Sequence, residues 1–257
     1  MTADNNEGRR RFLARTLGAA SGLLLSGCDY LSWSGAFVRL VEGAEKLSGA
    51  AQHLVTSRTS LAQEFTEADL SPYFRSNGTS NPQNPAYQAM AQNGFADYRL
   101  EVTGRVKRRT AFSLAELRDL PSRTQITRHD CVEGWSAIGK WKGAKLAPLL
   151  TRVHPLPDAR YVVFHCADPM DDAGTSYYES IDMEDANHPQ TILAYEMNNQ
   201  PLPTKNGAPI RVRIERQLGY KMAKYIMRIE VVESFAGISG GKGGYWEDEG
   251  YEWYAGI

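Results

Sequence analysis

The residue types most able to carry chemistry cluster between His129 and Ser136, in the sequence HDCVEGWS. Cys131 stands alone there, in a polar segment that contains a glycine, and two carboxylates and an indole flank it. A thiolate is a soft ligand for metals and also a nucleophile. A cysteine in such a segment can equally be a buried structural residue. The segment alone therefore leaves three interpretations of Cys131 open: metal ligand, nucleophile or structural residue.

The segments around this stretch have the pattern of an α+β domain with more strand than helix. Short runs of apolar side chains, several of them alternating with polar ones, predict strands at residues 98–103, 161–164, 210–215 and 227–232. A capping box from Ser113 to Glu116 predicts a short helix that stops at Pro121, and residues 145–153 predict a second one. Strands and helices do not alternate regularly and there is no GxGxxG motif, so we expect no doubly wound sheet.

Length and composition limit the classes of function. The 257 residues suit one large domain or two small ones, and 42% hydrophobic with 10% aromatic residues is typical of a globular protein. The formal net charge of −1 gives no electrostatic support for binding nucleic acid. Three cysteines, Cys28, Cys131 and Cys166, are too few for a disulfide framework, and no CxxC pair is present. We therefore expect a globular protein with no nucleic-acid partner.

The sequence CVEGWS from Cys131 to Ser136, followed by Trp141-x-Gly143 and a Leu-x-x-Leu pair, resembles the core of the sulfite oxidase superfamily of molybdopterin-dependent oxidoreductases. It is closer to the bacterial periplasmic branch, which includes methionine-sulfoxide reductase catalytic subunits, than to sulfite oxidases proper, which usually have Ala-Gly-Asn-Arg after the cysteine. The resemblance covers roughly residues 73–257. It implies a sulfite-oxidase-like molybdopterin-binding fold, with strand-rich mixed sheets and short helices, and one molybdopterin whose molybdenum has Cys131 as its only protein ligand.

The resemblance also implies a binding site for the pterin and its phosphate. Asn206 matches a residue that hydrogen-bonds the pterin, and Arg211 matches one that binds the phosphate; a guanidinium gives bidentate, charge-assisted bonds to phosphate oxygens. Met222, Ala223 and Lys224 match a segment whose amides and lysine wrap that phosphate. Read locally, Asn206 and the next glycine predict only a tight turn that leads into a strand, and Arg211 could be a solvated strand residue.

Three further candidate cofactor contacts follow from two looser matches. The sequence YFRSN at residues 73–77 resembles the segment that opens the cofactor pocket, so Arg75 and Asn77 are candidate contacts; the alternative is a surface loop. Cys166 stands where the periplasmic reductases often have a threonine that contacts the cofactor. Its thiol could hydrogen-bond weakly or only pack. A disulfide between Cys166 and Cys131 would remove the metal ligand.

The C-terminal stretch from Gly244 to Tyr254 is dense in aromatic and acidic residues. In the family, a tyrosine of this stretch reaches the solvent-facing side of the metal, and Tyr251 matches it best, with Tyr254 second. A phenol can donate a hydrogen bond to a substrate oxygen. Glu133, two residues after the predicted ligand, is a second candidate catalytic residue at the pocket mouth. The alternative is that the aromatic side chains only pack on the core.

Residues 1–28 predict a targeting signal. Arg9 to Arg11 precede Phe12 and Leu13 and a short apolar run, which resembles a twin-arginine signal for export of folded proteins. Leu25-Ser-Gly-Cys28 resembles a lipobox, and an aspartate after it resembles an inner-membrane retention signal. We therefore expect a periplasmic protein tethered to the inner membrane by a lipidated Cys28. The alternatives are an ordinary basic leader and a buried cysteine.

Apolar residues spaced by three or four predict that residues 29–66 form a helical tether, ahead of an oxidoreductase domain at residues 67–257. The resemblance implies two-electron oxygen-atom transfer, either reduction of a sulfoxide or oxidation of sulfite, with electrons exchanged with a separate haem-containing protein. We expect a monomer, because no immunoglobulin-like dimerisation domain follows residue 254. Sulfite, a dianion, would require arginines at the metal, for which Arg75, Arg213 and Arg216 are available.

Two other classes of function stay open from the residues. A hydrolase or transferase could use Cys131 as a nucleophile together with a histidine. A lipoprotein binding module could keep the fold without the cofactor.

Overall fold

The computed structural model describes residues 34–35, 59–171 and 174–257. Contacts divide the chain into two units, Met1–Ser57 and Arg58–Ile257. The predicted signal at residues 1–28 and most of the predicted helical tether, residues 29–33 and 36–58, lie outside the described residues. The site and its scaffold therefore belong to the second unit.

The second unit is built from short helices and ten strands in its described residues. The helices and 3-10 turns are η1 (Glu67–Asp69), α3 (Pro85–Gln92), α4 (Leu114–Arg118), α5 (Leu146–Val153), α6 (Met183–Asn187), η2 (Thr204–Asn206), η3 (Gly219–Lys221) and α7 (Tyr245–Asp248). The strands are β1 (Arg99–Gly104), β2 (Thr110–Ser113), β3 (Ser122–Cys131), β4 (Trp135–Lys145), β5 (Tyr161–Pro169), β6 (Ser176–Asp182), β7 (Ile192–Met197), β8 (Gln200–Pro201), β9 (Arg211–Arg213) and β10 (Ile226–Val232).

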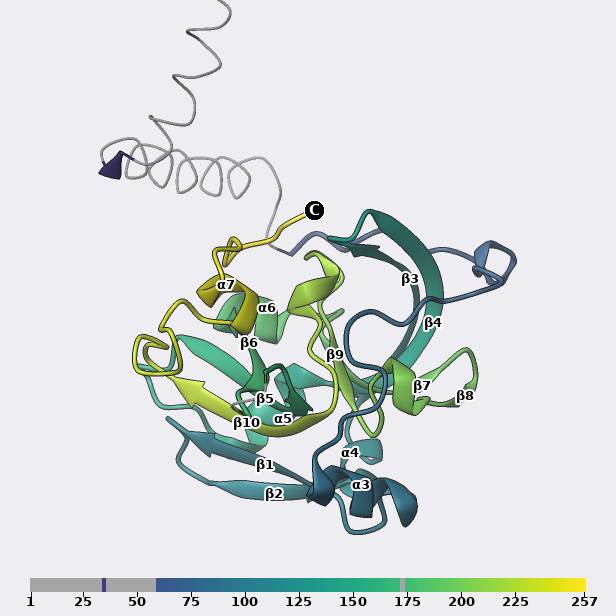
Figure 1. Cartoon of the computed structure of the whole chain (residues 1–257). Helices are drawn as coiled ribbons and strands as arrows, with labels where there is room; N and C mark the ends of the chain where they lie inside the picture. The colour runs from purple at the N-terminus through teal and green to yellow at the C-terminus, as the bar shows by residue number, and fades with distance from the viewer. Residues whose placement is uncertain (1–33, 36–58, 172–173) are drawn as a thin grey trace, which may run out of the picture. The chain divides into compact units, whose positions relative to one another are not determined.

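These strands form two sheets (Figure 1). One has the order β2-β1-β10-β5-β6, and within it only the β1–β10 pair is parallel. The other has the order β3-β4-β7-β8, with β9 added alongside β7, and all its pairs are antiparallel. The prediction of a strand-rich α+β domain with mixed sheets and short helices is confirmed.

Local sequence signals explain where the short helices begin. Ser113 caps α4, since its hydroxyl accepts from the Glu116 amide while the Glu116 carboxylate accepts from the Ser113 amide, which is the predicted capping box. Helix α5 buries Leu146, Leu149 and Leu150 against the main core, which lies between the two sheets. The strands predicted at residues 98–103, 161–164 and 227–232 are present as β1, β5 and β10.

The hairpin of β3 and β4 carries Cys131 at its tip, and Figure 1 shows the two strands as a long curved ribbon. Cys131 is the last residue of β3 and pairs with Trp135, the first of β4. The reversal between them uses Gly134 with a φ of 84°, a conformation that glycine adopts without strain. Alternate residues of β3 point inward, so His129 and Cys131 face the interior together.

Residues 59–66 differ from the predicted helical tether. They are not helical: Glu64 forms a bridge with Thr127 of β3, and the Phe65 amide donates to the Ile126 carbonyl at 2.8 Å. Backbone pairing to β3 satisfies these amides without a helix. The described residues include no helix of sufficient length and apolar character to cross a membrane.

Candidate active site

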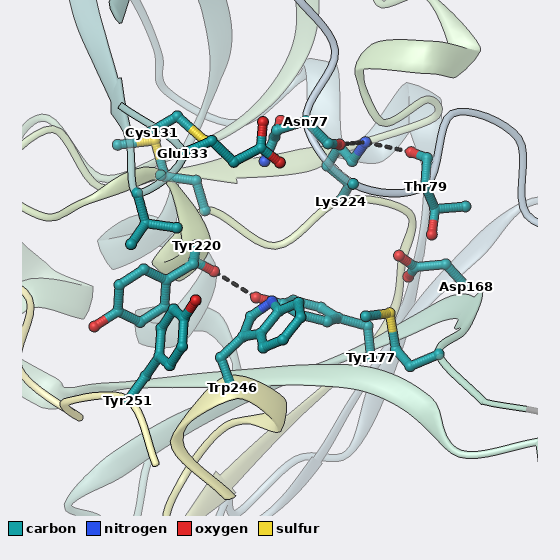
Figure 2. Close-up of a pocket in the computed structure, with 15 residues that line it drawn as sticks. Asn77, Thr79, Cys131, Glu133, Asp168, Tyr177, Tyr220, Lys224, Trp246 and Tyr251 are labelled. Atoms are coloured by element: carbon teal, nitrogen blue, oxygen red, sulfur yellow. Dashed lines mark hydrogen bonds between the residues drawn. The ribbon is translucent and has the colours of Figure 1, made fainter. Parts of the chain in front are cut away.

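A cavity of about 250 Å³ lies beside the tip of the β3–β4 hairpin (Figure 2). Six separate stretches of the chain line it, each contributing side chains or backbone. The lining residues are Asn77, Gly78, Thr79, Cys131, Val132, Glu133, Asp168, Met170, Tyr177, Gly219, Tyr220, Met222, Lys224, Trp246 and Tyr251. Six of the residues predicted for the site are therefore brought together here: Cys131, Glu133, Asn77, Met222, Lys224 and Tyr251.

Cys131 lies at one end of this cavity with Glu133 beside it (Figure 2). Burial raises the pKa of the Cys131 thiol, although an amide hydrogen bond from Glu133 and the charges of Arg75 and Arg211 oppose this. Within the described part of the chain both Cys131 and Cys166 are free thiols, so the alternative of a disulfide between them is absent. A thiol that faces a cavity can coordinate a metal ion there, and coordination would deprotonate it.

Lys224 lies in the part of the cavity wall that also includes Asn77 and Thr79 (Figure 2). Its ammonium donates to the carbonyl oxygens of Asn77, Thr79 and Lys205, with distances of 2.5 Å to Asn77 and 3.4 Å to Lys205. Burial and the nearby Arg211 guanidinium lower the pKa of Lys224 to about 7. This lysine joins the residue 77–79 loop to the segment after η3, and its charge is available to a bound anion.

Arg211 and Asn206 lie behind that wall, buried and outside the cavity lining. The Arg211 guanidinium donates to the carbonyl oxygens of Asn206 and Met222, both at 3.1 Å. Burial and Arg213 lower the pKa of Arg211 to about 9, which leaves it protonated at neutral pH. Arg211 Nε and Asn206 Nδ2 have no partner within the described part of the chain. Buried donors are almost always paired, so these two atoms fit a group that brings acceptors.

The remaining predicted contacts do not line the cavity. Cys166 is buried in the main core, and its thiol donates to the Phe164 carbonyl oxygen at 4.0 Å. Ala223 is buried and its carbonyl accepts from Val212. Arg75 is exposed, with its guanidinium 5.9 Å from the Trp135 ring, and Tyr254 is half-buried away from the lining.

A buried polar row lies behind Cys131, and of its members only Arg213 was predicted, as an arginine that could bind sulfite. Arg213 is fully buried, forms an ion pair with Glu215 at 2.6 Å, and donates to Nδ1 of His129 at 2.9 Å. Burial and the charges of Arg213 and Arg211 hold the pKa of His129 well below its usual range, so His129 is neutral. Arg213 is thereby engaged inside the protein. It does not line the cavity, and neither does Arg216, so neither supplies the cavity charge that sulfite would require.

Several lining residues carried no readable signal in the sequence. Asp168 is buried, and burial raises its pKa to about 6. Tyr177, Tyr220 and Trp246 form a run of aromatic side chains along one side, and Tyr177 donates to the Tyr220 carbonyl at 2.5 Å (Figure 2). Asp168 lies two residues after Cys166 on β5. Its place on the same strand as a predicted contact was the only indication of its position in the sequence.

The family model for the oxidoreductase molybdopterin binding domain matches residues 87–236. The chain belongs to this family. It is 38% identical over 253 residues to a protein of Azospira oryzae provisionally named a protein-methionine-sulfoxide reductase subunit (YedZ1), which covers 96% of this chain and 87% of that one. It is also 38% identical over 145 residues to the protein-methionine-sulfoxide reductase catalytic subunit MsrP of Ralstonia nicotianae, covering 53% of this chain and 44% of MsrP.

A solved structure, the sulfane dehydrogenase SoxCD of Paracoccus pantotrophus, is similar to this chain with a TM-score of 0.48 and 20% sequence identity. The similar region covers 54% of this chain and 39% of the SoxCD chain. The family match and the relatives confirm the predicted superfamily, the predicted fold class and the predicted cofactor. This protein is therefore a molybdenum-dependent oxidoreductase with a molybdopterin cofactor. The matched domain supplies most of the cavity wall, while residues 77–79, Trp246 and Tyr251 lie outside the matched range.

Proposed function

We propose that this oxidoreductase transfers an oxygen atom at a molybdenum bound by the Cys131 thiolate, and that it works as a sulfoxide reductase. The observation that carries the proposal is the opening of Cys131 onto the same cavity as Lys224 and Asn77, with Glu133 and Tyr251 exposed at its edge. The relatives named as methionine-sulfoxide reductase subunits support the choice of substrate class.

We assign the cofactor-binding roles to the part of the wall that includes Lys224 and to the buried residues behind it. We assign Lys224 and Arg211 to the phosphate and Asn206 to the pterin, because each brings a cation or an unpaired buried donor. Asn77 and Met222 line the space between. The side chains of Ala223, Cys166 and Arg75 do not line the cavity, so we assign them no role here and their cofactor contacts stay predictions from the sequence.

When bound, the cofactor supplies the two-electron redox chemistry, while the protein supplies the thiolate, the phosphate contacts and the shape of the cavity. Reduction of a sulfoxide consumes two electrons and two protons and releases a sulfide and water. Tyr251 and Glu133 are lining groups that can hydrogen-bond the substrate oxygen or pass protons to it. Trp135 Nε1 donates to the Glu133 carboxylate at 3.0 Å and orients it.

The charges of the lining favour a neutral sulfoxide over the sulfite dianion. Among the lining residues Lys224 is the single cation, and its proposed role is to bind the cofactor phosphate rather than the substrate. Two carboxyl groups, Glu133 and Asp168, also face the cavity and would repel a dianion. The rest of the lining is mainly thioether and aromatic, which suits the carbon groups on a sulfoxide sulfur.

A nucleophilic role for Cys131 has less support. The cavity lining includes no histidine, and His129 behind it is neutral with Nδ1 accepting from Arg213. Burial also raises the pKa of the thiol, which lowers the thiolate fraction that a nucleophile requires. A bound molybdenum removes this difficulty, because coordination itself deprotonates the thiol.

We further propose that the enzyme is exported folded by the twin-arginine route, acts in the periplasm, and is held at the inner membrane by a lipidated Cys28. The arginines at residues 9–11 and the Leu-Ser-Gly-Cys sequence before residue 29 support this. Electrons would come from a separate haem-containing protein, and the name of the MsrP relative as a catalytic subunit is consistent with a partner. Loss of membrane association in Cys28→Ala would test the anchor.

The test of the function uses protein purified from a host that makes molybdopterin. We expect stoichiometric molybdenum in the wild type, reduction of methionine sulfoxide with a reduced viologen dye, and little oxidation of sulfite. Cys131→Ser should abolish activity and lose the metal's thiolate signature in X-ray absorption. Arg128→Gln, an exposed change on the same strand, is the matched control and should leave metal and activity unchanged.

Well-folded wild-type protein without molybdenum would overturn the proposal and favour a binding module. Activity that survives in Cys131→Ser would overturn the ligand assignment. Activity without metal that iodoacetamide abolishes would establish the nucleophile instead. Faster turnover of sulfite than of any sulfoxide would reverse the assigned direction.

A further inference from the structure

A buried cluster of charges lies outside the residues assigned to the cofactor. It consists of Lys221, Glu179 and Glu247, and the side chains of all three are at most 1% exposed. The Lys221 ammonium donates to Glu179 Oε1 and, at 2.5 Å, to Glu247 Oε1. We call these three residues the Lys221 cluster.

The Lys221 cluster has two carboxyl groups for one ammonium. An unbalanced buried negative charge is strongly unfavourable. Burial raises the pKa of Glu179 well above its usual range, and the carboxyl of Glu247 lies within hydrogen-bonding reach of it. Glu179 Oε2 and Glu247 Oε2 have no other partner among the described residues. One proton on the Glu179 carboxyl brings the net charge of the cluster to zero.

The three members come from three different elements, and their chain neighbours line the cavity. Glu179 on β6 is two residues from Tyr177, Lys221 ends η3 between Tyr220 and Met222, and Glu247 in α7 follows Trp246. Figure 2 shows Tyr177, Tyr220, Trp246 and Tyr251 along one side of the cavity. The Lys221 cluster thus joins the elements from which this aromatic wall is built.

The wall depends on α7 for Trp246 and Tyr251. The Tyr251 amide donates to the Trp246 carbonyl at 2.9 Å, and the two rings stack with centroids 5.4 Å apart. The Tyr220 ring meets Tyr251 edge-on at 5.4 Å. Helix α7 has four residues and no side-chain cap, so it is too short to be stable by itself. Contacts with the rest of the protein must fix it.

We propose that Lys221, Glu179 and Glu247 are positioning residues for the reaction at Cys131, because they fix α7 and so hold Trp246 and Tyr251 as a wall of the substrate end of the cavity. None of the three lines the cavity. The inference depends on the proposed function only for the substrate used in the kinetic assay.

The test compares variants of the loaded enzyme at Glu247. Glu247→Ala removes the carboxyl from α7, so KM for methionine sulfoxide should rise about tenfold, the factor that corresponds to one lost hydrogen bond to a charged group, while molybdenum content stays unchanged. Glu247→Gln keeps an oxygen for the Lys221 ammonium and an amide for Glu179, so KM should return to near the wild-type value. Glu249→Ala is the matched control. It removes an exposed carboxyl two residues further along the chain and should leave KM and molybdenum content unchanged.

Limited chymotrypsin digestion gives a readout that needs no substrate. Cleavage at Tyr245, Trp246 or Tyr251 should be faster in Glu247→Ala than in the wild type, Glu247→Gln and Glu249→Ala. If Glu247→Ala does not fold, Glu247→Asp replaces it, because its carboxyl is one methylene shorter and draws away from Lys221.

Unchanged KM and unchanged cleavage in the Ala or Asp variant would overturn the inference. So would a loss of molybdenum and stability in which the loaded fraction keeps its wild-type KM, because the cluster would then only stabilise the fold. An inactive wild type would overturn the proposed function alone, since faster cleavage in the Ala variant would still support the fixing of α7.

Discussion

Lys224 combines a position in the cavity wall with a pKa that burial and Arg211 lower to about 7. A lysine with a lowered pKa is largely neutral above that pH and charged below it. An anion binds its ammonium form, so above about pH 7 binding must be accompanied by uptake of a proton. The contribution of Lys224 to the anion affinity of the cofactor-free protein should therefore be constant below about pH 7 and should fall by up to about tenfold per pH unit above it.

Sulfate is a suitable probe for this prediction, because its own charge is constant between about pH 6 and 9. Calorimetric titration of cofactor-free protein should show the fall for the wild type and not for Lys224→Arg, whose guanidinium stays charged. Equal pH dependence in the two proteins would show that Lys224 is not the anion's partner.

The Arg213–Glu215 pair gives a second prediction at the level of single residues. Both side chains are at most 1% exposed, so Glu215→Ala leaves a buried guanidinium without its carboxylate. We expect the free energy of unfolding to fall by about 3–5 kcal/mol. The exposed pair Arg105–Asp158 is the matched comparison, and Asp158→Ala there should cost at most about 1 kcal/mol. Urea unfolding of both variants measures the difference, and equal losses would contradict it.

Among the elements, the contact of β4 with β7 places the hairpin that carries Cys131. Gly143 on β4 pairs with Ala194, and a Cβ at Gly143 would lie 2.2 Å from the Leu193 carbonyl oxygen. Gly143→Ala must therefore push the two strands apart. We expect a loss of about 1–3 kcal/mol or more in stability, together with weaker retention of molybdenum, because β4 also pairs with β3.

Gly237→Ala is the control for this strand contact, since nothing lies within 4 Å of the added Cβ. Its stability should stay within about 0.5 kcal/mol of the wild type. Urea unfolding and metal analysis of the two variants test the prediction. A Gly143→Ala protein as stable as Gly237→Ala would mean that β4 and β7 can separate at little cost.

Elements that depend on local pattern could be predicted from the sequence. The capping box of α4 and the alternation in β1 and β10 act over a few residues, so periodicity sufficed. The site was predictable only where family motifs covered it, as at Cys131 and Lys224. Asp168 and Trp246 were missed because their place in the lining results from long-range packing. The strand predicted at residues 210–215 is present only as β9 (Arg211–Arg213), and the alternation gave no sign that its polar side is buried too.

For the whole molecule, the cofactor should contribute to stability because its binding residues come from distant parts of the chain. A ligand that binds only the folded state stabilises it by about 4 kcal/mol when present at about a thousand times its dissociation constant. For a protein of this size that corresponds to a rise of about 10 °C in Tm. Calorimetry of cofactor-loaded and cofactor-free protein measures it.

Hydrogen exchange on the same two samples should show where the gain lies. Protection should increase at residues 77–79, 131–133 and 219–224, which line the cavity. A rise in Tm with no added protection in these segments would indicate that the cofactor binds elsewhere.

The stretches that line the cavity are spread along the chain, from Asn77 to Tyr251. A ribosome makes the protein in that order, so Trp246 and Tyr251 emerge after every other part of the lining has been synthesised. A nascent chain that has reached Lys224 already has the thiol, the cations and the pterin-side donors, yet it lacks one side of the enclosure. Enclosure of a bound cofactor is therefore complete only when the segment that carries Trp246 and Tyr251 has packed against η3 and β6.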